Sequence, residues 1–169
     1  MEIKLNVKAA VVGLVVLLLL PGVSQALTDE QKALGGLKGL YVSVDDIQPE
    51  VKRLGLTKDQ IKTDVELRLR KAGVKVLTEK EWLATPGCPY LFVNVNTNIV
   101  PTSAIFSYAI SVGLKEAVML DRDMGVSATI WERTVVGNIE KSKISKIRET
   151  IGDGVDIFLN DYLAANPKQ

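Results

Sequence analysis

The sequence predicts an α+β domain in which two amphipathic helices cover one face of a mixed, mainly antiparallel sheet of about five strands. Three observations lead to this fold class. A well-capped helix lies between two strand-like segments, several segments alternate apolar and polar residues, and the last long segment repeats apolar residues every three or four positions. The predicted element order is β-α-β-β-β-β-α.

Residues 1–26 have the layout of a secretory signal peptide. Lys4 and Lys8 precede an uncharged apolar run, and small residues including Ala26 occupy the positions expected at a cleavage site. The run is shorter than the roughly 20 residues that cross a bilayer. We therefore expect a periplasmic or secreted protein without a stable membrane span after cleavage. An uncleaved membrane anchor is the alternative.

The rest of the chain is expected to form one domain. Residues 27–39 are polar and rich in glycine, which indicates a flexible arm or a short helix. Residues 40–166 form the predicted single α+β domain, and residues 167–169 a tail. No linker or internal repeat divides residues 40–166.

Charge and composition exclude several functions. The chain has 21 basic and 20 acidic side chains, and the segment before the expected cleavage carries Glu2, Lys4 and Lys8, so the remainder is formally neutral. Nucleic-acid binding normally requires a positive excess. The chain has no histidine and one cysteine, so a Ser-His-Asp triad, a Cys-His pair and a zinc-thiolate cluster are all impossible within it. We expect no cofactor and no metal.

The first strand and first long helix follow from local signals. Residues 40–47 alternate apolar and other residues and predict a strand. Thr57 and Gln60 form a capping box before a helix that ends at Gly73. The apolar stripe of this helix consists of Ile61, Val65, Leu69 and Ala72.

The remaining elements follow in order. Residues 74–77 predict a short strand, 78–82 a helical turn and 90–97 another strand. Residues 105–136 predict a hairpin around the turn at 121–125, whose two aspartates we interpret as a polar turn and not as a calcium site. A final amphipathic helix begins near Ser142 and ends before Pro167. Its apolar stripe consists of Ile144, Ile147, Ile151, Val155, Phe158 and Tyr162.

The face of the sheet opposite its aliphatic residues is the best candidate for a binding surface. Aromatic, amide and guanidinium groups suit the recognition of proteins or glycans. In the alternative interpretation, the amino-terminal arm or a second copy of the chain covers this face. The candidate binding residues are Tyr90, Phe92, Asn94, Asn96, Trp131 and Arg133.

Glu116 and Cys88 are the two single residues with potential chemical roles. Glu116 is the acid that interrupts an apolar strand face, which indicates an ion pair or, alternatively, a buried carboxyl with a raised pKa. Cys88 lies between Gly87 and Pro89 with no base close in sequence, which favours a structural turn residue. An intermolecular disulfide is the alternative for Cys88.

The segment GLTKDQIKTDVELRLRKAGVKVL carries a resemblance in layout. A capped helix, a glycine and a strand in this order resemble small periplasmic α+β domains, such as the amino-terminal domain of the Tol–Pal translocation protein and the curli secretion lipoprotein domain. The whole chain also resembles an uncharacterised family of exported bacterial proteins. The resemblance to the periplasmic domains implies a docking function without catalysis, whereas the uncharacterised family implies no function.

The sequence therefore predicts an exported, non-catalytic binding or assembly module of the bacterial cell envelope. It would dock an envelope protein through a sheet face or a strand edge. One alternative is an envelope enzyme that uses carboxylate chemistry on a glycan. The other is a homo-oligomeric structural protein.

Overall fold

The computed structural model describes residues 26–98 and 102–167. Apart from Ala26, the expected signal peptide lies outside these residues. The described chain forms an α+β domain with a mixed sheet of four strands. Its elements are α2 (Asp29–Ala33), β1 (Tyr41–Val44), α3 (Pro49–Arg53), α4 (Lys58–Lys71), α5 (Glu79–Leu83), β2 (Tyr90–Asn98), β3 (Ile105–Leu120), β4 (Met124–Glu140), a 3-10 turn (Lys141–Lys143) and α6 (Lys146–Ala165).

The strands lie in the order β1-β2-β3-β4. β1 and β2 are parallel, whereas β3 pairs antiparallel with both of its neighbours. The prediction of about five strands is wrong, because residues 74–77 make only one isolated bridge, between Leu40 and Val76. The chain then turns into the cap of α5 at Thr78, which leaves no room for a longer ladder.

The two long helices confirm the predicted pattern. The Thr57–Gln60 capping box begins α4, and Gly73 follows its end with a positive φ of 84°. In α6 the predicted stripe is buried at Ile147, Ile151, Val155 and Phe158, whereas Tyr162 is half-buried. A Cβ atom at Gly154 would lie 3.0 Å from a methyl group of Val112. The glycine therefore lets α6 pack closely against β3. The helix begins at Lys146, later than predicted, because the 3-10 turn precedes it.

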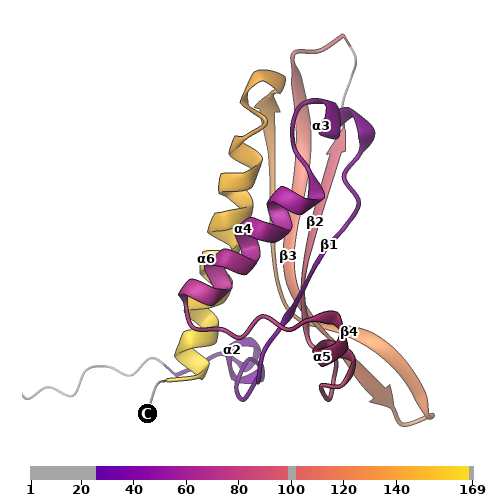
Figure 1. Cartoon of the computed structure of the whole chain (residues 1–169), viewed down its shortest axis with the longest axis vertical. Helices are drawn as coiled ribbons and strands as arrows, with labels where there is room; N and C mark the ends of the chain where they lie inside the picture. Colours follow the sequence, from indigo (N-terminus) through magenta and orange to yellow (C-terminus); the bar gives the residue numbers. More distant parts are fainter. Residues whose placement is uncertain (1–25, 99–101, 168–169) are drawn as a thin grey trace, which may run out of the picture.

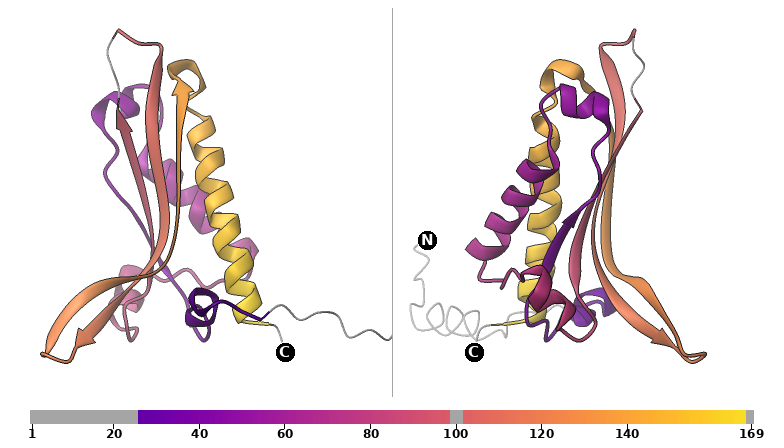
Figure 2. Two further views of the ribbon diagram at one scale, coloured as in Figure 1. Left: turned by 180° about the vertical axis from the view of Figure 1, so that it is seen from behind. Right: turned by 45° about the vertical axis from the view of Figure 1, so that its right-hand side comes forward.

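Both long helices cover the same face of the sheet, as Figure 1 shows. The core between the two layers includes Val42, Leu91, Val93, Ile110, Val112, Leu114, Ile147, Val155 and Phe158. Figure 2 shows that α4 and α6 leave the opposite face of the strands without a helical layer. We call this surface the open face.

Residues 27–39, the predicted arm, do not cover the open face. Residues 29–33 form α2, whose Gln31 donates a hydrogen bond of 2.7 Å to Asp161 of α6. The backbone N–H of Gly36 donates to the side chain of Asn166, just beyond α6. The predicted arm is thus attached to the carboxyl-terminal helix, which removes the alternative in which it shields the open face.

A β-bulge divides the long hairpin into two parts. Leu114 pairs with Trp131 and Lys115 pairs with Thr129, so Ile130 is an extra residue in β4. A bulge bends the strand that carries it and increases its twist. Beyond this point the hairpin bends away from the helical layer (Figure 2). We call residues 115–129 the hairpin arm.

Candidate functional site

Four of the predicted site residues lie together on the open face. Tyr90, Phe92, Asn94 and Asn96 alternate along β2 with the buried residues Leu91, Val93 and Val95. The β3 residues opposite Phe92, Asn94 and Asn96 are small, whereas Lys115 lies opposite Tyr90. The side chains of Phe92, Asn94 and Asn96 therefore extend above the short side chains of the neighbouring strand β3.

Trp131 does not lie on the open face, so its predicted placement is wrong. It is 1% exposed and packs edge-on against Phe158 of α6, with the ring centroids 5.2 Å apart. Its Nε1 donates a hydrogen bond of 2.9 Å to Asp161. The extra residue Ile130 reverses the alternation of β4, which turns Trp131 into the core.

Arg133 follows Trp131 to the helical side, so its predicted placement is also wrong. Its guanidinium lies 5.0 Å from the Trp131 ring centroid and forms a salt bridge of 3.0 Å with Glu30. A second, longer ion pair of 3.7 Å joins it to Asp161. Arg133 therefore connects β4 to α2 and α6 and does not belong to the open face.

An aromatic pocket occupies the open face where the hairpin arm bends. It has a volume of about 400 Å³. β1, β2, α5, the turn before β2 and both strands of the arm contribute to its wall. The lining residues are Tyr41, Ser43, Trp82, Cys88, Tyr90, Phe92, Ala117 and Ser127.

The rings of the pocket support one another. Trp82 stacks on Tyr41 with centroids 5.0 Å apart and meets the edge of Tyr90 at 5.8 Å. Tyr90 in turn packs edge-on against Phe92 at 6.4 Å. The Tyr90 hydroxyl is 3.1 Å from the Ser127 hydroxyl, which ties the arm to this wall. The contacts fix the pocket before any ligand binds.

The turn at Cys88 connects α5 to the arm. Trp82 Nε1 donates a hydrogen bond of 2.6 Å to the Cys88 carbonyl, and the Ala117 N–H donates to the Gly87 carbonyl at 2.7 Å. Cys88 itself has a positive φ of 40°, an uncommon conformation outside glycine. It is a free, half-buried cysteine in a turn, as predicted, and it also lines the pocket.

α5 is held in place by charged and capping contacts. The Thr78 side chain accepts from the Glu81 N–H, and the Glu81 carboxylate accepts from the Thr78 N–H at 2.9 Å. Lys75 forms a salt bridge of 2.8 Å with the same carboxylate. The Lys75 hydrogen bond, followed by those from Thr78, lowers the pKa of Glu81 to about 2. This carboxylate stays ionised at neutral pH and keeps Trp82 positioned.

Polar side chains continue the open face beyond the pocket. Asn94 donates a hydrogen bond of 2.7 Å to Asp45, and Asn96 donates to Asn94. On the next strand pair, the hydroxyls of Ser111 and Thr134 are 2.7 Å apart. The open face is therefore aromatic at the arm and polar toward the other end.

Two of the four aromatic residues of the pocket, Tyr41 and Trp82, were not among the predicted site residues. Because Tyr41 alternates with the buried Val42, the sequence shows which face of the sheet its side chain lies on. The sequence does not show which residues contact that side chain. The parallel register that places Tyr41 opposite Tyr90 joins segments far apart in the chain. Trp82 belongs to a helix of five residues, and no periodic signal shows where so short a helix packs.

Glu116 lies on β3 at the base of the arm. A Cβ atom at Gly87 would lie 3.5 Å from its Oε2, so the carboxyl borders the Cys88 turn. Burial raises its pKa above the ordinary value of 4.5. No ion pair of Glu116 is found among residues 26–98 and 102–167, which favours the predicted alternative of a half-buried carboxyl.

Replacing Glu116 with glutamine is expected to change the pH dependence of stability. Because the folded-state pKa is raised, the folded protein holds this proton more tightly than the unfolded chain. The contribution of Glu116 is therefore complete below about pH 4.5 and is lost as pH rises through the folded-state pKa. The glutamine variant should gain stability relative to the parent over that rise, measured by urea unfolding at several pH values. A constant difference across pH would contradict this assignment.

Deleting Ile130 is expected to remove the bulge and straighten the arm. Ser127 would then move away from Tyr90, because the bend that brings them together depends on the extra residue. Nuclear Overhauser contacts between the two side chains provide the measurement. Ile130→Ala is the matched control, since it retains the residue count. Equal loss of the contacts in both variants would show that the side chain, and not the bulge, sets the bend.

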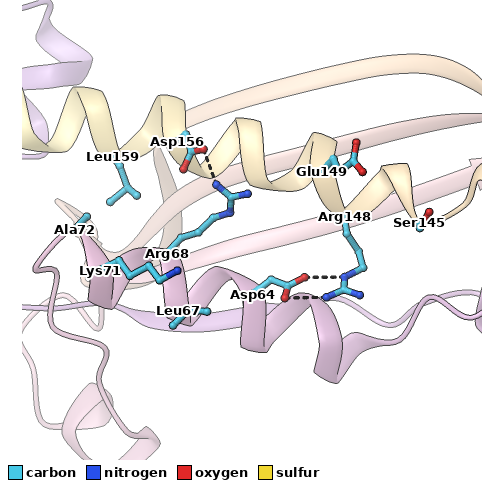
Figure 3. A pocket seen from close by; sticks show the side chains of 10 residues that line it. All are labelled: Asp64, Leu67, Arg68, Lys71, Ala72, Ser145, Arg148, Glu149, Asp156 and Leu159. Carbon is cyan, nitrogen blue, oxygen red and sulfur yellow. Dashed lines mark hydrogen bonds and ion pairs between the residues drawn. The ribbon is translucent and has the colours of Figure 1, made fainter.

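A second cavity lies between the helices, shown close up in Figure 3. It is an open groove of about 740 Å³. Arg148 of α6 forms two hydrogen bonds of 2.7 and 2.9 Å with Asp64 of α4, and Arg68 contacts Asp156 at 2.6 Å. These opposite charges neutralise one another across the groove. The groove is therefore a helix–helix contact, and the aromatic pocket is the stronger candidate for a site.

Within residues 26–98 and 102–167, no cluster of three or more acidic or cysteine side chains could hold a metal ion. Over the same residues, no helix has the length and apolarity to cross a membrane.

The fold and the aromatic pocket define a small α+β domain with an open sheet face. No protein-family model matches the chain, and no curated protein matches it. Among solved structures, the chain is similar to the rare lipoprotein B from Shewanella oneidensis, with 18% identity and a TM-score of 0.35. The match covers 76% of this chain and 96% of that one. So low a similarity carries no argument about function, and the resemblance to the Tol–Pal and curli domains stays a prediction.

Proposed function

We propose that the protein is an exported, non-catalytic binding module of the bacterial cell envelope, which docks a protein partner through the open face. The single observation that carries this proposal is the preformed aromatic pocket on the open face. The signal-peptide layout of residues 1–26 supports export.

The chemistry of the open face suits a protein surface. Recognition surfaces combine a few aromatic anchors with a polar rim that excludes water. Here the rings lie at the bend of the arm, and Asn94, Asn96 and Thr134 provide donors and acceptors around them. Val136, on the same face of β4, is 74% exposed and adds apolar area.

The proposal is tested by blocking the open face with a bulky charge. The tagged parent and its Thr134→Arg variant would be purified from envelopes, and bound proteins identified by mass spectrometry. Thr134 is exposed on the open face, whereas Thr63 is exposed on α4. Thr63→Arg is therefore a control with the same change in charge and size.

A partner retained by the parent and by Thr63→Arg but lost from Thr134→Arg would support docking through the open face. Loss from the Thr63→Arg variant alone would contradict it. Capture of only the protein's own copies would favour the homo-oligomeric alternative.

An envelope enzyme is the second candidate, favoured by the raised pKa of the Glu116 carboxyl. Hydrolysis of a glycosidic bond requires two carboxyl groups placed across a cleft. Burial, and not a neighbouring carboxylate, raises the pKa of Glu116. Turnover of an envelope glycan that disappears in Glu116→Gln would favour the enzyme over the binding module.

A further inference from the structure

We propose that the aromatic pocket takes one apolar side chain from an acidic segment of the partner, with Lys62 and Lys115 binding the carboxylates on either side of it. The inference rests on the proposed function and names the chemistry of its partner. It starts from two lysines that contact pocket rings.

Both lysines lie over aromatic rings of the pocket. Lys62 comes from α4 and places its Nζ 4.8 Å from the Tyr41 ring centroid and 3.4 Å from the Tyr41 hydroxyl. Lys115 comes from β3 and places its Nζ 4.4 Å from the Phe92 ring centroid. Both side chains are half-buried. The two cations therefore contact two different rings of the pocket wall, Tyr41 on β1 and Phe92 on β2.

Neither lysine has a carboxylate partner among residues 26–98 and 102–167. Nearby Lys75 shows the contrast, because it forms a salt bridge of 2.8 Å with Glu81. A contact between a cation and a ring is weaker than a charge-assisted hydrogen bond to a carboxylate. An incoming acidic side chain would thus draw each ammonium off its ring.

The size and lining of the pocket define the group that fills it. A volume of about 400 Å³ accommodates one large side chain, and half of the lining residues are aromatic. The lining contains no acidic side chain, lysine or arginine. Its polar groups are hydroxyls, one indole N–H and one thiol, from Tyr41, Ser43, Tyr90, Ser127, Trp82 and Cys88. The pocket itself therefore favours an uncharged apolar group. Charged groups of the ligand would instead contact Lys62 and Lys115, which lie outside the lining.

A peptide fits this arrangement better than an acidic saccharide. Sugars pack their flat faces on exposed ring faces, but Lys115 lies over Phe92, and Tyr41 contacts both Trp82 and Lys62. In an extended peptide, every second side chain points to the same side. A segment with acidic, apolar and acidic residues at alternate positions spans roughly 13 Å between the acids. Lys62 contacts Tyr41 on β1, and Lys115 lies on β3, two strands away. Two strand spacings are roughly 10 Å, a length that the segment can span.

The test uses the blocked pentapeptide Glu-Ser-Trp-Ser-Glu and the mature protein. Cys88 is the only cysteine and lines the pocket, so its alkylation by iodoacetamide reports occupancy. Peptide-induced shifts in nitrogen-15 spectra provide an independent measurement. The control peptides are Gln-Ser-Trp-Ser-Gln, which lacks the charges, and Glu-Ser-Ala-Ser-Glu, which lacks the anchor.

The matched variants change the same net charge at two places. One carries Lys62→Gln and Lys115→Gln. The other carries Lys52→Gln and Lys143→Gln, in α3 and in the 3-10 turn, away from the pocket. We expect saturable slowing of Cys88 alkylation by the acidic peptide, with at least tenfold weaker binding to the pocket variant and unchanged binding to the control variant. Both control peptides should bind at least tenfold more weakly.

Three results would overturn the inference. The first is equal binding of the neutral peptide, and the second is no protection of Cys88 at about 10 mM acidic peptide. The third is protection by oligoglucuronate without protection by the peptide, which would assign the pocket to a saccharide. The same experiments distinguish failure of this inference from failure of the proposed function. An envelope partner that is lost from Thr134→Arg but retained by Lys62→Gln/Lys115→Gln would contradict only the acidic-peptide inference.

Discussion

Replacing Trp131 with alanine is expected to lower the free energy of unfolding by about 3–5 kcal/mol, the usual cost of removing a large buried aromatic side chain. The ring is 1% exposed and packs against Phe158, and its Nε1 donates to Asp161. Arg133 would also lose the ring beneath its guanidinium. Urea unfolding followed by circular dichroism provides the measurement.

Trp131→Phe is the control for the aromatic contact. It keeps a ring against Phe158 but removes the donor to Asp161, which should cost about 1.5–3 kcal/mol. An alanine variant as stable as the parent would show that Trp131 does not belong to the core. Such a result would favour the position of Trp131 on the open face that the sequence predicts.

Replacing Trp82 with alanine is expected to have a small effect on stability and a large effect on binding. Trp82 is half-buried, so its loss should cost only about 1–2 kcal/mol of stability. Binding to the open face should nevertheless fall at least tenfold. The substitution removes the ring stacked on Tyr41 and releases the Cys88 carbonyl that positions the turn. Affinity for the acidic pentapeptide and for an isolated envelope partner would be measured beside the unfolding curve.

Trp82→Phe separates the two roles of this residue. It retains an aromatic ring for Tyr41 but not the hydrogen bond to the Cys88 carbonyl. We expect intermediate binding. If Trp82→Ala were strongly destabilised and Trp131→Ala were not, the assignment of one tryptophan to the site and the other to the core would be wrong.

Local signals predicted the long elements because those elements carry their own evidence in sequence. The capping box at Thr57, the glycine after α4 and the apolar stripe of α6 each act within one or two helical turns. The hairpin was also predicted, since both of its strands alternate over most of their length. The elements that these patterns predict are present in the folded protein because tertiary contacts favour the same local structure.

The open face was predicted correctly on β2 but not on β4. Ile130 and Trp131 are adjacent apolar residues, and this break in alternation is the sequence signal of the bulge. Once one residue is inserted, every later side chain changes face. Trp131 and Arg133 consequently lie on the helical side, where they contact α2 and α6.

The pocket could not be assembled from sequence, because its parts meet through long-range pairing. Tyr41 joins Tyr90 through a parallel register, and Trp82 reaches both from a helix of five residues. The sequence did not predict the short helix α3 (Pro49–Arg53), and it predicted a strand where Val76 forms only an isolated bridge. Elements this short lack a periodic pattern.

The most direct test of the central claim is photo-crosslinking from the two faces of the molecule in intact cells. A benzophenone amino acid would replace Phe92 on the open face or Ile157 on α6, which is 44% exposed. Docking through the open face predicts a crosslink to a distinct envelope protein from position 92 and none from position 157. Crosslinks from position 157 alone would contradict the account and assign the partner to the helical layer.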